Sequence, residues 1–373
     1  MRLTIDVHAG DGDARAGTIR TPRGELPTPL FMPVGTKAAV KTLEPPDLHE
    51  LGVPLILANT YHLMLRPGAA TVASLGGLHR FMGWNGHVVT DSGGFQVFSL
   101  APAVTEEGAI FRSTYDGSRH HLSPEGAVAV QEQLGADISM VLDVCVGLPA
   151  PAAVIRDAVD RTARWAGRAR AAFVAGAGPR SDRGLRQSQF GIVQGGIDPI
   201  LRCESAQRTA ELEFDGYAVG GLSVGEPRHE MVPALAAALE ELPADQPRYL
   251  MGVGDPASLV EAVGLGVDMF DCVLPTRHAR HGTILTDSGR YQLSNARFAA
   301  DPEPLDPACC CPVCARWSRG YLRHLLQVGE PSAGRLLTIH NLSWTLGLMG
   351  RMGEAIRAGT FAALRAEVLA VWG

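Results

Sequence analysis

The feature of this sequence that most constrains its fold is a regular alternation of short apolar runs with amphipathic stretches. Eight apolar runs that end at glycine or polar residues occupy 30–34, 54–58, 87–90, 138–142, 190–193, 217–220, 249–253 and 267–271. Helical patterns lie between most of them, at 67–76, 124–135, 151–175, 198–212, 227–241 and 256–264. Strands that alternate with helices predict an α/β protein with a parallel sheet. Eight strands in about 240 residues fit a TIM-type (β/α)8 barrel better than an open doubly wound sheet.

The segments on either side of this alternation have other patterns. Residues 3–29 predict an antiparallel hairpin that turns at Pro22-Arg23-Gly24. Four prolines within 302–312 lead into a cluster of cysteines, and helical periodicity returns at 320–328 and 353–369. We therefore expect two domains, a barrel with its N-terminal hairpin at 1–300 and a helical zinc-binding subdomain packed on the barrel at 301–373.

The composition is that of a globular protein, with 46% hydrophobic and 19% charged residues, which excludes a disordered chain. No apolar run approaches the roughly 18 residues that a membrane helix needs, so we expect a soluble cytoplasmic protein. The net charge of −6 gives no sign of a nucleic-acid partner. Residues 275–373, however, carry 11 arginines against 7 acidic residues, a net charge of +4 that can hold a polyanion locally.

Unusual residues stand where the expected strands end. Asp91 follows the third strand, Asp143 the fourth and Gln194 the fifth, and Asp271 ends the eighth. The carboxyl ends of barrel strands converge on one face, where barrel enzymes keep their active sites. A single aspartate at a strand end is most often a helix N-cap. Several that face one pocket repel one another, which stability alone does not favour, so we infer a catalytic site at this face.

The residue types at these strand ends suit glycosyl transfer involving a purine. Two carboxylates can flank an anomeric carbon, one as the nucleophile and the other as acid and base. An aspartate, a glutamine and backbone N–H and C=O groups suit the hydrogen-bonding edge of a purine, and Phe95 and Met251 can stack on its faces. The pattern specifies neither the base nor the sugar.

A second constellation predicts a metal site. Four of the seven cysteines are crowded together, and the motif Cys309-x-Cys311-x2-Cys314 is followed by His340. Three thiolates and one imidazole make a closed tetrahedral zinc site, which is structural because no coordination position stays open. Cys310 is a spare thiol that the ligand set could include instead.

A basic run follows the eighth strand. Arg277 and Arg280, three residues apart, would stand beside the pocket and suit contact with phosphate. The alternative is an ordinary solvated loop.

Longer motifs connect these residues in order. The chain carries NTYHLMLRPG at 59–68, TDSGGFQV at 90–97, GIVQGG at 191–196, GGLSVGE at 220–226 and MFDCVLPTR at 269–277. With these motifs and the cysteine cluster it resembles a bacterial tRNA-guanine transglycosylase, of the queuine tRNA-ribosyltransferase family, over nearly its whole length. The resemblance implies an irregular (β/α)8 barrel with a zinc subdomain, and a homodimer. It also implies exchange of the wobble guanine of GUN-anticodon tRNAs for a 7-substituted 7-deazaguanine, a step in queuosine biosynthesis.

The resemblance also implies a role for each matching residue. Asp271 would be the nucleophile that forms a covalent aspartyl-ribosyl intermediate, and Asp91 would be the general acid and base. The residues expected to bind the base are Ser92, Phe95, Asp143, Gln194, Gly221, Leu222 and Met251, with the Leu222 carbonyl toward the 7-substituent. Those expected to bind tRNA phosphates are Arg277 and Arg280. Those expected to bind one structural zinc ion per subunit are Cys309, Cys311, Cys314 and His340.

Two departures from the bacterial pattern concern the incoming base. Val144 stands where the family has a glutamate that helps to fix the backbone reading the 7-substituent, and 146–148 replaces a Thr-Pro-Tyr sequence. Cys145 and Val224 still favour a small substituent, because members that take queuine carry glycine where Val224 stands. We expect 7-aminomethyl-7-deazaguanine as the substrate. The alternatives are queuine, the 7-cyano base, or a non-catalytic tRNA-binding subunit.

Overall fold

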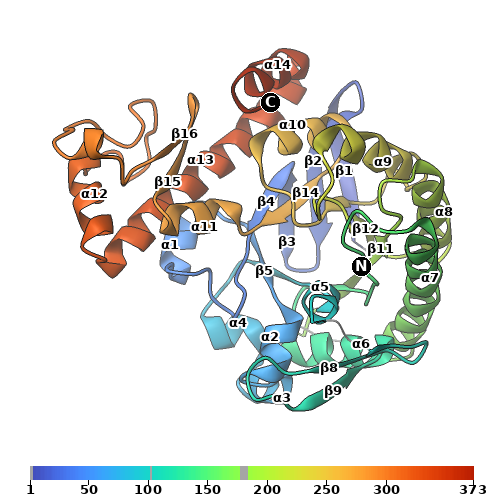
Figure 1. Cartoon of the computed structure of the whole chain (residues 1–373). Coiled ribbons are helices and arrows are strands. Elements are labelled where there is room, and N and C mark those ends of the chain that lie inside the picture. Colours follow the sequence, from blue (N-terminus) through green and yellow to red (C-terminus); the bar gives the residue numbers. More distant parts are fainter. Residues whose placement is uncertain (1–2, 101–102, 177–183) are drawn as a thin grey trace.

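The computed structural model describes residues 3–100, 103–176 and 184–373. Within them, eight parallel strands form a barrel with helices around it, which confirms the predicted fold (Figure 1). A parallel bridge between Val34 and Leu57 joins the two ends of the sheet and closes the ring. The strands follow one another around the barrel in the order β4 (Leu30–Pro33), β14 (Met269–Cys272), β13 (Arg248–Leu250), β12 (Gly216–Val219), β11 (Ser188–Val193), β10 (Ile138–Met140), β6 (His87–Thr90) and β5 (Leu55–Ala58).

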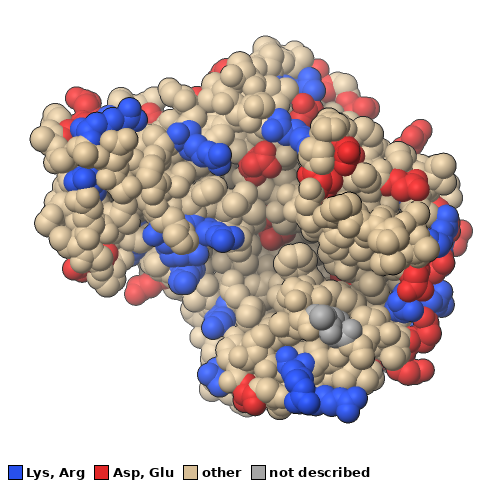
Figure 2. All heavy atoms as spheres, in the orientation of Figure 1, with Lys and Arg blue, Asp and Glu red and all other residues tan. Residues whose placement is uncertain are grey.

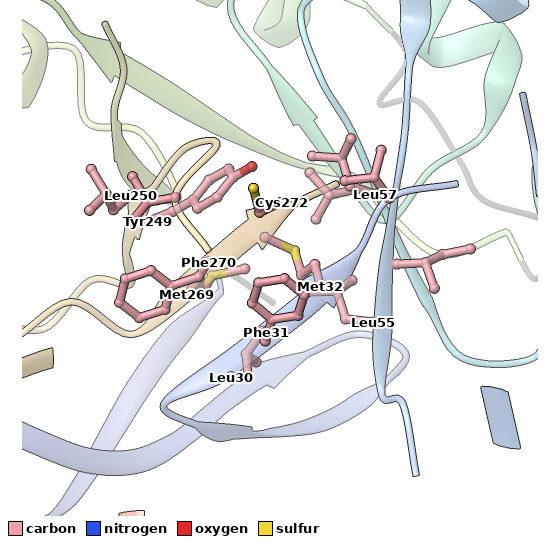
Figure 3. Close-up of a cluster of buried hydrophobic side chains, with 14 of the residues drawn as sticks. Leu30, Phe31, Met32, Leu55, Leu57, Tyr249, Leu250, Met269, Phe270 and Cys272 are labelled. Atoms are coloured by element: carbon pink, nitrogen blue, oxygen red, sulfur yellow. The ribbon is translucent and has the colours of Figure 1, made fainter. Parts of the chain in front are cut away.

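Each of the eight strands lies within three residues of the predicted run, because the apolar side chains that marked the runs are the ones buried in the barrel. Figure 3 shows Phe31 of β4, Leu57 of β5 and Phe270 of β14 within one apolar cluster. Residues in register on neighbouring strands share a level of the barrel, and Asp271 on β14 pairs with Met32 on β4. Packing of this cluster thus fixes the position of Asp271 along the barrel axis, at the carboxyl end of β14.

The longer connecting helices lie where the sequence predicted them, and several short helices that it did not predict lie beside them. Three begin with an N-cap side chain followed by proline, the arrangement that favours a helix start: Ser123 accepts from Gly126 N, Asp198 from Ile200 N and Asp255 from Ser258 N. None of the helices in the described ranges is both long and apolar enough to span a membrane. The helices up to the end of the barrel are α1 (Pro45–Glu50), α2 (Thr60–Leu65), α3 (Ala69–Ser74), α4 (Gly77–Met82), α5 (Gly94–Phe98), α6 (Pro124–Leu134), α7 (Ala152–Ala175), α8 (Pro199–Ala210), α9 (Arg228–Glu240), α10 (Pro256–Gly264) and α11 (Leu274–Arg280).

Small antiparallel sheets add to the barrel. The predicted N-terminal hairpin has a third strand, a second sheet is inserted between α5 and α6, and a hairpin follows α11. The last two were not predicted, because strands of two to four residues carry too little alternation to be recognised. These strands are β1 (Thr4–Asp11), β2 (Ala14–Thr21) and β3 (Gly24–Thr28), then β7 (Ala103–Val104), β8 (Ala109–Arg112) and β9 (Arg119–Leu122), then β15 (Thr283–Thr286) and β16 (Gly289–Gln292).

The C-terminal region is helical, but one predicted helix there was wrong. The region begins with a short 3-10 turn, η1 (Ala296–Phe298), which is followed by α12 (Arg319–Gln327). Instead of one helix at 353–369, α13 (Pro331–Ala358) ends at Gly359, whose φ of +66° suits glycine, and α14 (Phe361–Trp372) follows. Four glycines within α13 lower its helix propensity and obscured its length. The helix contacts β1, β2 and β4, so it lies against the barrel (Figure 1).

Candidate active site

Asp91, directly after β6, is buried and held by the start of α2. Asn59 donates from Nδ2 to its Oδ2 at 2.5 Å, and Thr60 donates its backbone N–H to Oδ1 at 2.7 Å. Gln96 on α5 donates to Oδ2 at 3.1 Å. Neither Asn59 nor Thr60 was predicted to belong to the site, although both directly follow the second strand of the barrel. The carboxylate therefore has one fixed orientation.

Burial raises the pKa of Asp91 from its usual value near 4 to about 6. The hydrogen bonds from Asn59, Thr60 and Gln96 oppose the rise, and the nearby charge of Asp271 adds to it. A carboxyl group with a pKa of about 6 can both take and give a proton near neutral pH, which is what a general acid and base requires.

Asp271, at the end of β14, is the second buried carboxylate of this face. Its Oδ1 accepts a hydrogen bond from the Tyr249 hydroxyl at 2.5 Å and one from the backbone N–H of Gly252 at 2.8 Å. Its Oδ2 accepts none from the described residues. Burial raises the pKa of Asp271, and the two hydrogen bonds oppose that rise. One oxygen is thus anchored while the other is free to react. Tyr249, on β13, was not predicted to belong to the site.

Asp143, Ser92 and Gln194, three of the residues expected to bind the base, form a connected polar group. Ser92 donates to Oδ1 of Asp143 at 2.9 Å, and Gln194 donates from Nε2 to Oδ2 at 2.6 Å. All three are buried, and burial raises the pKa of Asp143. Three polar groups in one buried network, each able to exchange its partner for a ligand, suit the recognition of a heterocyclic base.

Gly220 and Gly221 let the backbone after β12 approach this network closely. Gly221 has a φ of +65°, and a Cβ there would stand 2.2 Å from Gln194 Oε1. At Gly220 a Cβ would stand 2.9 Å from Gln194 Nε2. Only glycine fits both positions without displacing Gln194.

Arg202, on α8, supports this backbone from behind and was missed by the sequence reasoning. It is fully buried, and its guanidinium donates to the carbonyls of Gly196 at 2.8 Å, Val193 at 3.1 Å, Gly220 at 2.8 Å and Gly221 at 3.1 Å. Burial lowers the pKa of Arg202 to about 10, so it stays charged at neutral pH. One side chain thus ties the end of β11 to the end of β12.

The segment after Gly221 is held by a glutamate, although not at position 144. Glu226 accepts hydrogen bonds from the backbone N–H of Ser223 and, at 3.0 Å, of Val224. Val144 instead packs in an apolar cluster that includes Trp165. Glu226 therefore supports this backbone without a carboxylate at position 144.

The two residues expected to stack on a base differ in exposure. Met251, after β13, is half-buried and would lie 3.6 Å from a Cβ at Gly220. Phe95, on α5, is 61% exposed. Its aromatic face is free to meet a ligand that enters from solvent.

Arg277 and Arg280 lie on α11, directly after Asp271. Arg277 is exposed, and Arg280 is half-buried and donates to the carbonyl of Thr276 at 2.8 Å. Neither forms an ion pair with a carboxylate in the described part of the chain. Figure 2 shows basic side chains over α11, beside a hollow in this face of the molecule.

A second cluster, away from these carboxylates, could hold one metal ion. Ligand atoms of Cys309, Cys311, Cys314 and His340 all lie within 4.8 Å of one another. Nδ1 of His340 is 3.3 Å from Sγ of Cys314 and 3.6 Å from Sγ of Cys311, close to the edges of a tetrahedron with Zn–S near 2.3 Å and Zn–N near 2.0 Å. Nε2 of His340 lies 3.0 Å from the carbonyl of Leu285, which leaves Nδ1 for a metal.

Comparison with known proteins places this geometry in context. The family model for queuine tRNA-ribosyltransferase matches residues 11–373. A queuine tRNA-ribosyltransferase of Solidesulfovibrio magneticus is 52% identical over 371 residues, which cover 99% of this chain and 98% of the relative. Those of Desulforudis audaxviator, at 53% over 374 residues, and of Sphingopyxis alaskensis, at 50% over 371 residues, cover the same shares.

Proposed function

Because the chain belongs to the queuine tRNA-ribosyltransferase family, a family of pentosyltransferases, we propose that it exchanges the wobble guanine of GUN-anticodon tRNAs for a 7-substituted 7-deazaguanine. The observation that carries the proposal is the pair of buried carboxylates, Asp91 and Asp271, beside a polar network built to hold a base. The pair matches what transfer of a ribosyl group between two bases needs.

In the proposed reaction Asp271 attacks the ribose. Its free Oδ2 forms a bond to C1′, and the bond from C1′ to N9 of guanine breaks, so the electron pair leaves with the base. Protonated Asp91 gives its proton to the leaving guanine and is left ionised for the second half. The hydrogen bonds from Tyr249 and Gly252 hold the other oxygen and keep Oδ2 turned toward the sugar. The product of this half is a covalent aspartyl-ribosyl intermediate.

In the second half Asp91 takes the proton from N9 of the incoming base. That nitrogen attacks C1′, and the carboxylate of Asp271 is released. The raised pKa of Asp91, about 6, supports this role because the group is mostly ionised at neutral pH and still basic enough to accept a proton.

For the incoming base we propose 7-aminomethyl-7-deazaguanine. The network of Ser92, Asp143 and Gln194 would hold the purine edge, together with the Gly221 backbone and the Leu222 carbonyl. Val224, with a side chain where queuine-using members are expected to have glycine, favours a small 7-substituent. Phe95 and Met251 would enclose the ring. The flipped-out nucleotide of a tRNA loop needs such an enclosed site.

We propose zinc for the cluster of Cys309, Cys311, Cys314 and His340, because three thiolates and one imidazole match its preferred set. The ion would join the cysteine loop to α13 and take no part in the transfer. By resemblance we also propose a cytoplasmic homodimer and a domain boundary near residue 300. Sedimentation of the purified protein tests the dimer.

The test of the function is incorporation of radiolabelled guanine into unmodified tRNA, followed by a chase with the 7-aminomethyl base, the 7-cyano base and queuine in parallel. We expect label to enter, and the 7-aminomethyl base to displace it at the lowest concentration. Preference for queuine would overturn the proposed substrate. No entry of label, with tRNA still bound, would overturn the proposed exchange in favour of a tRNA-binding subunit.

A further inference from the structure

A group of cationic side chains lies at the rim of the catalytic face and takes no part in the proposed transfer. Lys37, in the segment after β4, has its Nζ 5.3 Å from the centre of the Tyr115 ring. Arg66, at the end of α2, has its guanidinium carbon 4.8 Å from the same centre. Two cations from distant parts of the chain thus share one aromatic ring.

Hydrogen bonds fasten the Tyr115 loop to α2. His62, one turn before Arg66 on α2, lies with Nδ1 2.9 Å from the Tyr115 hydroxyl. The buried Tyr61 contacts the same loop, with its hydroxyl 3.1 Å from Oγ1 of Thr114. Because Tyr61 and His62 lie on α2, the loop that carries Tyr115 is fastened to the helix that also orients Asp91.

These charges are not neutralised within the described residues. Lys37 and Arg66 are exposed, and no ion pair or hydrogen bond joins either of them to a carboxylate there. The acidic residue next to Tyr115, Asp116, is instead occupied by Ser118, which donates to it at 2.7 Å. Like charges brought together without counter-charges cost stability, so a negatively charged ligand is the simplest reason for the arrangement.

The position of the group continues the basic surface of α11. β14, β4 and β5 are neighbours in the barrel, with the ring closed between β4 and β5. Arg277 follows β14, Lys37 follows β4 and Arg66 ends the helix after β5, so the three lie along one arc of the rim. In Figure 2 basic side chains continue along the side of the hollow from α11 toward α2.

We propose that Lys37 and Arg66, held on Tyr115, form a second phosphate-binding site that grips the backbone of the bound tRNA beyond the contacts of α11. This inference rests on the proposed function for the identity of the polyanion. Backbone contacts position a nucleic acid and supply salt-dependent affinity without reading its sequence. The site would set the path of the strand over β4 and β5 and leave the chemistry at Asp91 and Asp271 unchanged.

The experiment compares Lys37→Ala, Arg66→Ala and the double variant with the wild-type protein in tRNA binding over a range of salt concentrations. We expect each single change to weaken tRNA affinity about 3- to 10-fold and to reduce the slope of log affinity against log salt by about 1. Binding of the free base and kcat at saturating tRNA should stay within about twofold. Arg80→Ala, on α4 before the amino end of β6, removes an equal exposed charge outside the rim and serves as the control.

Tyr115→Phe and Tyr115→Ala test the platform. The first keeps the ring, and the contact between Tyr61 and Thr114 still holds the loop, so it should bind tRNA like the wild-type protein. The second removes the ring and should resemble the single cation variants. Affinity and salt slope unchanged in the double variant would overturn the proposal, as would a loss of affinity explained by dissociation of an oligomer in sedimentation. Because tRNA binding is measured without turnover, a wild-type protein that binds tRNA through these residues but exchanges no guanine would refute only the proposed function.

Discussion

Asn59→Ala should move the pH dependence of the exchange toward higher pH. The Asn59 amide donates to Oδ2 of Asp91 and stabilises the ionised form, so its removal raises the pKa of Asp91 above its value of about 6. A hydrogen bond to a charged group contributes about 1.5–3 kcal/mol, and one pKa unit corresponds to about 1.4 kcal/mol. Water that enters the space left by Asn59 restores part of the loss, so we expect a rise of about one unit.

The raised pKa of Asp91 should lower kcat/KM for the incoming base at acidic pH. Asp91 must be ionised to take the proton from the incoming base, so kcat/KM for that base rises with pH through the pKa of Asp91. A shift from about 6 to about 7 lowers the ionised fraction about fivefold at pH 6, about twofold at pH 7 and hardly at all at pH 8.

The assay is kcat/KM for the incoming base from pH 5 to 9 at saturating tRNA. Asn295→Ala, at the start of the 3-10 turn η1, is a matched control that should keep the wild-type profile. An acid limb for Asn59→Ala that stays at the wild-type pH, or moves lower, would refute the assignment of that limb to Asp91.

Three further predictions test the support of the site. Gly221→Ala places a Cβ 2.2 Å from Gln194 Oε1 at a φ of +65°. It should raise KM for the base at least about tenfold, because the Gln194 amide must move away from Asp143. An unchanged KM would refute the close approach of the Gly221 backbone to Gln194. Arg202→Met leaves four carbonyls without their donor. It should weaken base binding and lower the Tm measured by calorimetry by at least about 3 °C. A variant as stable as the wild-type protein would contradict the role of Arg202 in supporting this backbone. Cys314→Ser should lower the zinc content, measured by metal analysis, and the Tm together; full zinc content in the variant would exclude Cys314 as a ligand.

The sequence predicted the barrel because its strands are marked by the residues that barrel packing buries. Runs such as His87 to Thr90 stand between polar or glycine residues, and their length excludes a helix. The helix starts at Ser123, Asp198 and Asp255 were predictable for a similar reason, since the capping side chain and the following proline act within one turn.

The partners of the carboxylates could not be predicted in this way, because they depend on which distant segments meet. Asn59 and Asp91 are 32 residues apart, and the Tyr249 hydroxyl reaches Asp271 across two neighbouring strands. Arg202 lies in a helix whose pattern gives no sign that this arginine is the buried one. The length of α13 could not be predicted either. Its glycines lower the local helix propensity, and packing against the barrel overrides that propensity.

The measurement that tests the central claim most directly is capture of a covalent complex between the protein and tRNA. Wild-type protein mixed with tRNA and then denatured should yield a protein–tRNA adduct that disappears when excess guanine is added before denaturation. Asp271→Asn should give no adduct and no exchange while binding tRNA with an affinity within about twofold of the wild-type protein, because only one oxygen of a buried side chain changes. An adduct or continued exchange in Asp271→Asn, or an adduct that maps to Asp91, would contradict the account.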